Sequence, residues 1–502
     1  MLKDRTSLIS SNSARFRRLS RIRTETEEEG KNKVKQIAVL LLLHVVLAFV
    51  MQESELAATI HSVLVLGVGV WNALTGKSLT KLLPIVAYIV GSEVLWRMTD
   101  ARIFWEFSKY SVVIILVVGL LKHRNIRGAI FPVFFFVLLI PSIILTINQL
   151  GFTRAAREAI SFNLSGALTL TICAITFLNV ILAKNDVQQV IWAMVYPITS
   201  VFILALSSTI GSREIVFTPD SNFVTSGGYG PNQVSAILGL GSLLLGMMLL
   251  ITKKGTPRLL VVLLAVSFIG QAILTFSRGG IVNVAISALA VIVQLILKPE
   301  KSFKRILFFL VIVLIIVFVV APRLDDFTSG ALRERYSDFD TTGRAEMLEA
   351  DLELFGKNKL TGVGVGMSAR FRRFMQGTAA HTEYSRLLAE HGFFGVAAIL
   401  LLIFMFVRAW FKAPDTISKA WTLSLSAWVF VEMSHAAMRV ACIGFVFGWA
   451  LCGFQSDEAE HVEHVDAPEY FDESERWNQE ALNQTYRGRR LIRSKRRSPR
   501  TS

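Results

Sequence analysis

The side chains that could perform chemistry are concentrated in one polar stretch, residues 322–391, within a chain that is otherwise largely apolar. His381 lies near the start of a predicted short helix, residues 380–391, and Arg344 and the basic run at residues 370–373 belong to the same stretch. An imidazole with a pKa near neutrality beside guanidinium groups could act as a general base next to a bound anion, as glycosyl or phosphoryl transfer requires. The alternative, which is the more common one for a lone histidine, is a surface residue on a solvated helix.

Arg278 is the second residue with a clear chemical use. It lies in the sequence FSRGGIVN, residues 276–283, between two apolar segments with almost no connector. Ser277 could cap the following helix, and Gly279 and Gly280 would leave its first turn bare. The free amide groups and the positive end of that helix would then lie beside the guanidinium group, an arrangement that suits a pyrophosphate. The alternative is an arginine at the membrane interface whose side chain extends to the lipid headgroups.

No metal, nucleotide or disulfide signature accompanies these residues. The glycine-rich run LTGVGVG, residues 360–366, lacks the G-x-G-x-x-G spacing and is predicted to form a tight turn. Four other histidines and the three cysteines lie apart from one another without ligand spacing, the cysteines inside apolar segments: His44, His61, His123, His435, Cys173, Cys442 and Cys452. We therefore expect neither a metal nor a cofactor, and no disulfide framework.

The composition predicts the elements that must hold these residues. Of the 502 residues, 53% are hydrophobic and 18% are charged, whereas a soluble protein carries roughly 25% charged residues. Apolar stretches of roughly 17–22 residues, the length that crosses a bilayer as a helix, recur at 34–51, 56–74, 82–99, 103–121, 129–147, 162–183, 187–209, 230–251, 258–276, 279–297, 304–321, 392–411, 418–433 and 437–455. We predict an all-α, polytopic transmembrane protein with about fourteen spans.

Basic residues fall on alternate connectors, which predicts the orientation of the chain. Lysine and arginine recur in connectors such as 122–127, 298–305 and 408–419, and the positive-inside rule makes this side cytoplasmic. The stretch 322–391 then becomes one large extracytoplasmic loop that carries short helices. The formal net charge of +15 is concentrated in these connectors and the two termini, so we expect contacts with membrane lipids and not with nucleic acid.

The same reasoning divides the chain into five parts. They are a disordered cytoplasmic arm at 1–33, transmembrane helices 1–11 at 34–321, the extracytoplasmic loop at 322–391, the C-terminal transmembrane helices at 392–455 and a charged cytoplasmic tail at 456–502. Neither terminal part has the apolar periodicity that a packed core requires.

Three sequence blocks, in this order, resemble the O-antigen ligase and O-antigen polymerase superfamily of bacterial envelope enzymes. They are GGYGPNQVSAILGLG at 227–241, TFSRGGIVNVAI at 275–286, and the run from TTGRAEM through LTGVGVG to AHTEYSRLLAEHGFFG at 341–395. The resemblance extends over residues 30–455, and the many spans with one large outer loop agree with it. The combination of these blocks is more specific than any one of them.

This resemblance implies a metal-independent glycosyltransferase on the extracytoplasmic face of the bacterial inner membrane. The implied donor is a saccharide on undecaprenyl pyrophosphate, and the implied acceptor is a sugar hydroxyl on lipid A core or on a second glycan. By position in the motifs, Arg278 and Arg344 would bind the pyrophosphate, and His381 would act as the base or orient the acceptor. Arg213, which precedes the GPN block, would join the arginines. Thr382 stands where the family usually has asparagine.

A transporter of polysaccharide or lipid-linked oligosaccharide, a flippase, is the alternative from another functional class. About fourteen spans would suit a transporter equally well. Such carriers place ionisable residues at the midplane between two repeated halves, whereas this sequence shows no internal repeat and gathers its polar residues in one loop. The choice between ligase and polymerase, which differ in their acceptor, stays open.

Overall fold

A computed structural model describes residues 32–455, except residues 124–127, 179, 213–214, 219, 252–257, 298–302, 304–305, 308–309, 312, 338–342, 373–376 and 379. By its backbone contacts the chain divides into Met1–Ser456 and Asp457–Ser502, and the described residues all belong to the first unit. The predicted cytoplasmic arm at 1–33 and tail at 456–502 therefore lie almost entirely outside the described residues.

The described residues are mostly helical, as the apolar segments require, because a membrane-embedded backbone can satisfy its own polar groups within a helix. The first half contains the helix Asn32–Glu53, then α2 (Glu55–Thr75), the 3₁₀ turn η1 (Leu79–Leu82), α3 (Leu83–Met98), α4 (Phe107–His123), α5 (Ile130–Leu139), α6 (Pro141–Leu150), α7 (Arg154–Leu178) and α8 (Lys184–Gly211). The second half contains the 3₁₀ turn η2 (Val224–Ser226), α9 (Pro231–Ile251), α10 (Arg258–Leu274), α11 (Arg278–Ile296), the π-helical turn η3 (Ile316–Val320), α13 (Ala321–Phe327), α14 (Ala331–Ser337), α15 (Arg344–Lys357), α16 (Ser368–Phe371), α17 (Glu383–His391), α18 (Phe393–Lys412), α19 (Thr416–His435) and α20 (Ala441–Ala450). Two short strands, β1 (Ile181–Ala183) and β2 (Gly453–Gln455), pair in parallel.

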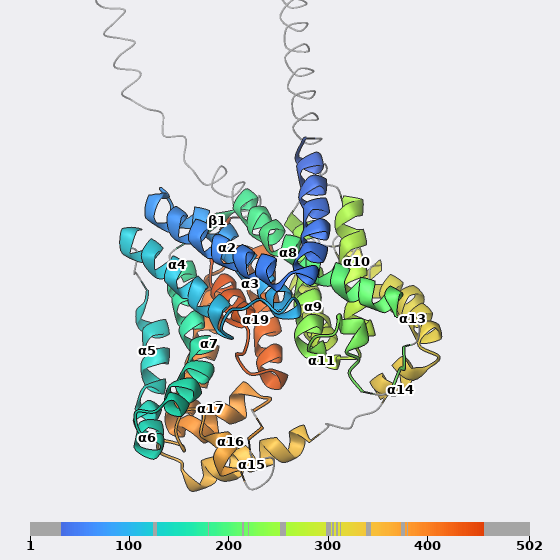
Figure 1. Cartoon of the computed structure of the whole chain (residues 1–502). Coiled ribbons are helices and arrows are strands. Elements are labelled where there is room, and N and C mark those ends of the chain that lie inside the picture. The colour runs from blue at the N-terminus through green and yellow to red at the C-terminus, as the bar shows by residue number, and fades with distance from the viewer. Residues whose placement is uncertain are drawn as a thin grey trace, which may run out of the picture. The chain divides into compact units, whose positions relative to one another are not determined.

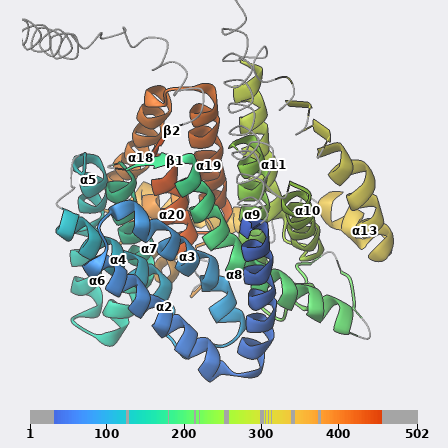
Figure 2. The same cartoon turned by 90° about the horizontal axis from the view of Figure 1, so that it is seen from above.

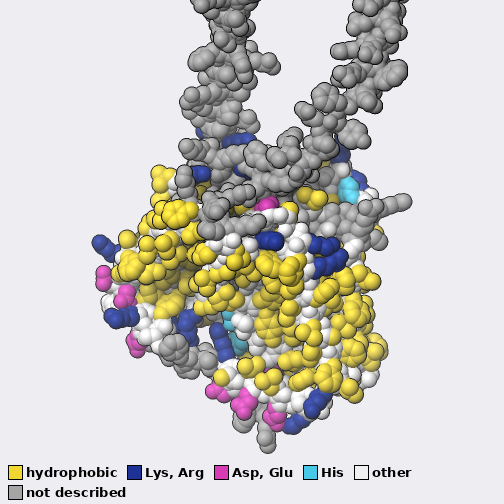
Figure 3. Space-filling model, turned by 180° about the vertical axis from the view of Figure 1, so that it is seen from behind, with side chains coloured by type: hydrophobic (Ala, Val, Ile, Leu, Met, Phe, Trp, Pro, Cys, Tyr) yellow, Lys and Arg dark blue, Asp and Glu magenta, His cyan; other side chains and the backbone are white. Residues whose placement is uncertain are grey.

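The predicted all-α, polytopic transmembrane fold is confirmed. Nine helices in the described part of the chain are long and apolar enough to cross a membrane, and α10 and α20 are shorter apolar helices. Figure 3 shows one face of the molecule covered by hydrophobic side chains, with charged side chains mainly toward its edges. The number of about fourteen spans and the extent of the loop at 322–391 stay predictions.

Helix α9 is the centre of the packing around the site. Most of its residues are buried, and it lies among α8, α10, α11 and α19 (Figure 2). Its contact with α11 depends on small residues, because a Cβ atom at Gly239 would lie 2.9 Å from the carbonyl oxygen of Gly280. A Cβ atom at Gly280 would in turn overlap the backbone of Ser235. The two helices can therefore approach closely only at these glycines.

The loop at 322–391 contains the five helices α13 to α17, and α15, α16 and α17 lie together at the end of the molecule opposite to β1 (Figure 1). The predicted helix at 380–391 is present, but it begins at Glu383 because the preceding residues are extended. It ends, as predicted, at Gly392, whose φ of 59° favours glycine. Most of α17 is buried, so it is not the solvated surface helix of the alternative interpretation.

Candidate active site

A cavity of about 200 Å³ opens between the N-terminus of α9, the residues before α17 and the connector from α19 to α20. Its polar lining includes Asn232, Gln233, His381, Glu432, His435 and Arg439. The GPN block and the loop histidine, which are far apart in the sequence, therefore meet in one cavity.

His381 lies on the wall of this cavity, half-buried. Burial first, and then the positive charges of Arg439, Arg344 and Arg372, lower the pKa of its imidazole from 6.5 to about 4. The expectation of a pKa near neutrality is therefore not met. The imidazole is neutral at physiological pH, so its unprotonated nitrogen can accept a proton or a hydrogen bond.

Arg278 is the first residue of α11, directly after Ser277. The hydroxyl of Ser277 does not cap the helix as predicted; it donates to Oδ1 of Asn232 at 2.8 Å and so links the SRGG block to the GPN block. The first turn of α11 is not bare either. A Cβ atom at Gly279 would lie 2.5 Å from Cε1 of the His435 ring, so this glycine provides space for an imidazole and not for an anion.

Arg278 and Arg344 lie near a third arginine, Arg335 of α14. The pKa of the Arg344 guanidinium is lowered by burial and then by the charges of Arg278 and Arg335. Arg335 is buried, and its Nε donates to the carbonyl oxygen of Phe276 at 3.0 Å. The structure thus brings together two of the predicted pyrophosphate ligands and adds one that the sequence analysis did not identify. Arg213 lies outside the described residues.

The other arginines of the loop have structural partners. Arg372 is fully buried, its Nε lies 2.7 Å from Oδ1 of Asp351, and its Nη1 donates to the carbonyl oxygen of Thr378 at 2.6 Å. Arg386 pairs with Glu383 and with Glu390. The hypothesis of a common anion-binding set at residues 370–373 is therefore wrong for Arg372, whose charge is compensated by a buried carboxylate.

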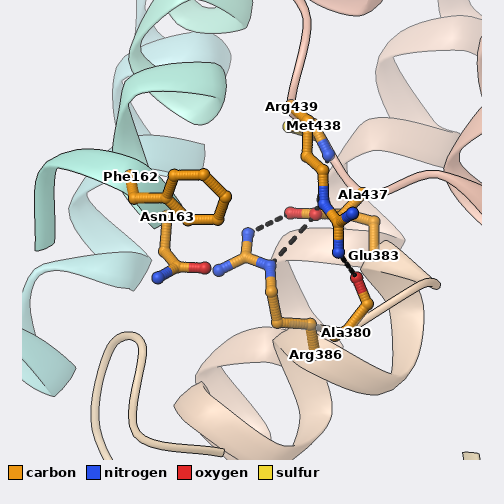
Figure 4. Close-up of a pocket in the computed structure, with 8 residues that line it drawn as sticks. All are labelled: Phe162, Asn163, Ala380, Glu383, Arg386, Ala437, Met438 and Arg439. Atoms are coloured by element: carbon orange, nitrogen blue, oxygen red, sulfur yellow. Dashed lines mark hydrogen bonds and ion pairs between the residues drawn. The ribbon is translucent and has the colours of Figure 1, made fainter. Parts of the chain in front are cut away.

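Arg439, in the connector between α19 and α20, is an unpredicted cation beside His381. Figure 4 shows its guanidinium pointing toward Ala380, to whose carbonyl oxygen Nη2 donates, while Arg386 faces Glu383. Its Nε has no hydrogen-bond partner among the described residues. One feature of the sequence could have identified Arg439. It lies in the otherwise apolar segment 437–455, and an arginine in such a segment usually faces a cavity or a partner.

A second histidine, His435, lies at the end of α19 and also lines the cavity. Its Nε2 lies 3.0 Å from Oδ1 of Asn283, and the amide nitrogen of Asn283 donates to Oε2 of Glu432. Asn283 and Glu432 are both buried. The sequence analysis missed these three residues because their spacing along the chain gives no sign of contact.

Residues 263–400 match a family model described as O-antigen ligase. The matched segment contains Arg278, Arg335, Arg344 and His381 and ends within α18, before the connector that carries Arg439. No curated protein matches the chain. Over residues 263–400 the chain is therefore similar to the O-antigen ligase family, which supports the resemblance to the O-antigen ligase and polymerase superfamily.

Proposed function

We propose that this protein transfers a saccharide from undecaprenyl pyrophosphate to a sugar hydroxyl, as an O-antigen ligase or a polysaccharide polymerase. The observation that carries the proposal is the cavity in which neutral His381 lies beside Arg439, with Arg344 close enough to shift its pKa. A base next to cations is the combination that a transfer with an anionic leaving group requires.

The pyrophosphate is bound, in this proposal, by Arg278 and Arg344, with Arg213 as a further ligand. The proximity of Arg278 and Arg335 to Arg344 supports this, because several guanidinium groups can act together on one bound dianion. Guanidinium groups also match the paired oxygens of a phosphate geometrically. Arg335 contributes charge and holds the backbone before Arg278.

His381 acts as the general base. The acceptor hydroxyl oxygen attacks the anomeric carbon, the bond from that carbon to the pyrophosphate oxygen breaks, and the pyrophosphate leaves with the electron pair. The hydroxyl proton passes to the imidazole of His381. Bound pyrophosphate would offset the field of the arginines that lowers the pKa of His381, so the residue becomes a stronger base when the donor is in place.

The arginines can stabilise the leaving group without a metal ion, and we propose that the reaction is metal-independent. Among the described residues, no group of three or more His, Cys, Asp and Glu side chains could hold a metal. The purified protein should therefore keep its transfer activity in excess chelator. Loss of activity that magnesium or manganese restores would contradict this proposal.

The active site is proposed to face the outside of the bacterial inner membrane, with both termini in the cytoplasm. Two features support this orientation: the alternation of basic connectors in the sequence, and the position of α15 to α17 at the end of the molecule opposite to β1 (Figure 1). A donor delivered to the outer leaflet would then reach the site from the membrane.

Analysis of the envelope glycans in a strain that lacks the gene tests this function. Accumulation of full-length lipid-linked polymer would identify a ligase, and accumulation of lipid-linked single repeat units would identify a polymerase. If the donor accumulates instead on the inner leaflet, the protein is a transporter and the proposed transfer is wrong.

A further inference from the structure

The wall of the cavity formed by the end of α19 has a different chemical character from the wall formed by His381 and Arg439. It presents His435 and Glu432, and the carboxylate Oε2 of Glu432 lies 3.6 Å from Nε2 of the imidazole. Asn283 of α11 lies behind both and contacts each of them. A cationic wall and an acceptor-rich wall therefore border the same space.

The hydrogen bonds of Asn283 determine which ring nitrogen of His435 carries the hydrogen when the imidazole is neutral. The amide nitrogen of Asn283 donates to the Glu432 carboxylate, so its carbonyl oxygen remains for His435. Nε2 of His435 must then carry the hydrogen and donate to that oxygen at 3.0 Å. Nδ1 is left as an acceptor, and it has no hydrogen-bond partner among the described residues.

Gly279 of the SRGG block fixes the position of the same ring. A Cβ atom at this residue would lie 2.5 Å from Cε1 and 2.8 Å from Nδ1 of His435. The ring therefore lies directly on the backbone of α11, held on one side by the glycine and on another by Asn283. Few rotamers remain for it, so its Nδ1 is preorganised.

We propose that His435 and Glu432 form the subsite for the acceptor glycan, in which Nδ1 of His435 accepts a hydrogen bond from a neutral sugar hydroxyl. The inference rests on the proposed transfer reaction. The acceptor atoms of this wall suit the hydrogen of a sugar hydroxyl, whereas they provide no positive charge for the pyrophosphate of the donor. The donor's anion instead belongs beside Arg278 and Arg344, the proposed pyrophosphate ligands.

The first test replaces His435 with phenylalanine, which keeps a ring on Gly279 but removes both nitrogen atoms. Purified protein is assayed with the lipid-linked saccharide and the unmodified acceptor glycan that accumulate in a gene-deletion strain. We expect the KM for the acceptor to rise about tenfold, the effect of one lost hydrogen bond, while the affinity for the donor stays at the parental value. His435→Asn, which keeps a hydrogen-bonding group near Nδ1, should recover part of the loss.

The second test moves the ring without changing it and does not depend on the folding of the His435 variants. Gly279→Ala should raise the acceptor KM in the same way, because the new methyl group displaces the imidazole. Gly270→Ala is the matched control: it also adds a methyl group to a helix glycine, but no atom lies within 4 Å of the new Cβ. In a His435→Ala background, Gly279→Ala should add little, because the ring that it displaces is gone.

Two outcomes would overturn the subsite. One is a parental acceptor KM in both His435→Phe and Gly279→Ala; the other is a loss of donor affinity as large as the loss for the acceptor. Either result leaves the proposed transfer intact if Arg278→Ala and His381→Ala still lower the transfer rate strongly. If those two variants also transfer glycan at the parental rate, the proposed function itself is wrong.

Discussion

Arg335 donates a hydrogen bond from Nε to the carbonyl oxygen of Phe276 at 3.0 Å. Phe276 has a φ of 58°, in the left-handed region that residues other than glycine rarely adopt, and it directly precedes Ser277 and Arg278. A buried arginine from the loop therefore supports a strained turn in the segment that positions a proposed pyrophosphate ligand.

Arg335→Ala removes this contact and one charge near Arg278. A hydrogen bond from a charged group typically contributes about 1.5–3 kcal/mol, so we expect a lower free energy of unfolding and weaker donor binding. Thermal unfolding and direct binding of the lipid-linked donor measure the two effects. Arg333→Ala, at an exposed position of the same helix, is the control and should change neither; unchanged donor binding in Arg335→Ala would exclude the supporting role.

Arg278→Ala should weaken donor binding and reduce turnover, because negative charge on the pyrophosphate grows as the glycosidic bond breaks. The loss of such a contact typically reduces the rate about a hundredfold. Arg278→Lys should be nearly as harmful, since an ammonium group cannot contact two oxygens in the geometry of a guanidinium. Arg370→Ala removes an exposed arginine of the loop and should leave both quantities unchanged. Parental donor affinity in Arg278→Ala would refute the assignment.

His381→Ala should leave donor binding nearly intact while turnover falls. The loss of a general base typically reduces the rate by about 10²–10⁴-fold, and a residue that acts only on the hydroxyl proton has little effect on the bound donor. Donor affinity and transfer rate are to be measured on the same preparation. Transfer at the parental rate would show that His381 is not the base.

The decline of activity at acidic pH measures the pKa of His381 in two states: kcat/KM gives it for the free enzyme, and kcat gives it for the enzyme with bound donor. A base must be unprotonated, so activity declines as the pH falls through its pKa. For the free enzyme, kcat/KM should decline only near pH 4, the value to which burial and the neighbouring arginines lower the pKa of His381. The limb of kcat should lie at a higher pH, because bound pyrophosphate raises that pKa. Coincident limbs would contradict this mechanism.

Sidedness can be measured with single cysteines and an impermeant maleimide in whole cells. The native cysteines, Cys173, Cys442 and Cys452, are buried and should give little background. Glu349→Cys, exposed on α15, should react in intact cells, whereas Lys412→Cys, exposed at the end of α18, should react only after lysis. The reverse pattern would place the cavity on the cytoplasmic side.

The helical membrane fold could be predicted from the sequence, and Arg278, Arg344 and His381 could be chosen as candidates, because those signals are local. Apolar length indicates a span, and a charged residue in an apolar setting indicates a partner. The misassigned residues depend instead on distant contacts. Gly279 had a plausible local use at a helix start, and only the fold shows that His435 occupies that space.

The same limit applies to the cations around His381. In the sequence, Arg372 resembles an anion-binding residue. The carboxylate that compensates its positive charge belongs to Asp351, which lies on the separate helix α15. Arg439 had no local motif, and its proximity to His381 follows from the packing of the α19–α20 connector against the residues before α17. Charge alone therefore did not separate structural arginines from those that reach the cavity.

Asp351 connects two helices of the loop at 322–391. Its carboxylate pairs with Arg372 and also accepts a hydrogen bond from Oγ of Ser385 at 2.7 Å, and it is fully buried. α15, which begins with Arg344, is thereby clamped to α17, which follows His381. The loss of this one carboxylate would therefore loosen the segment of the proposed anion ligand and the segment of the proposed base at the same time.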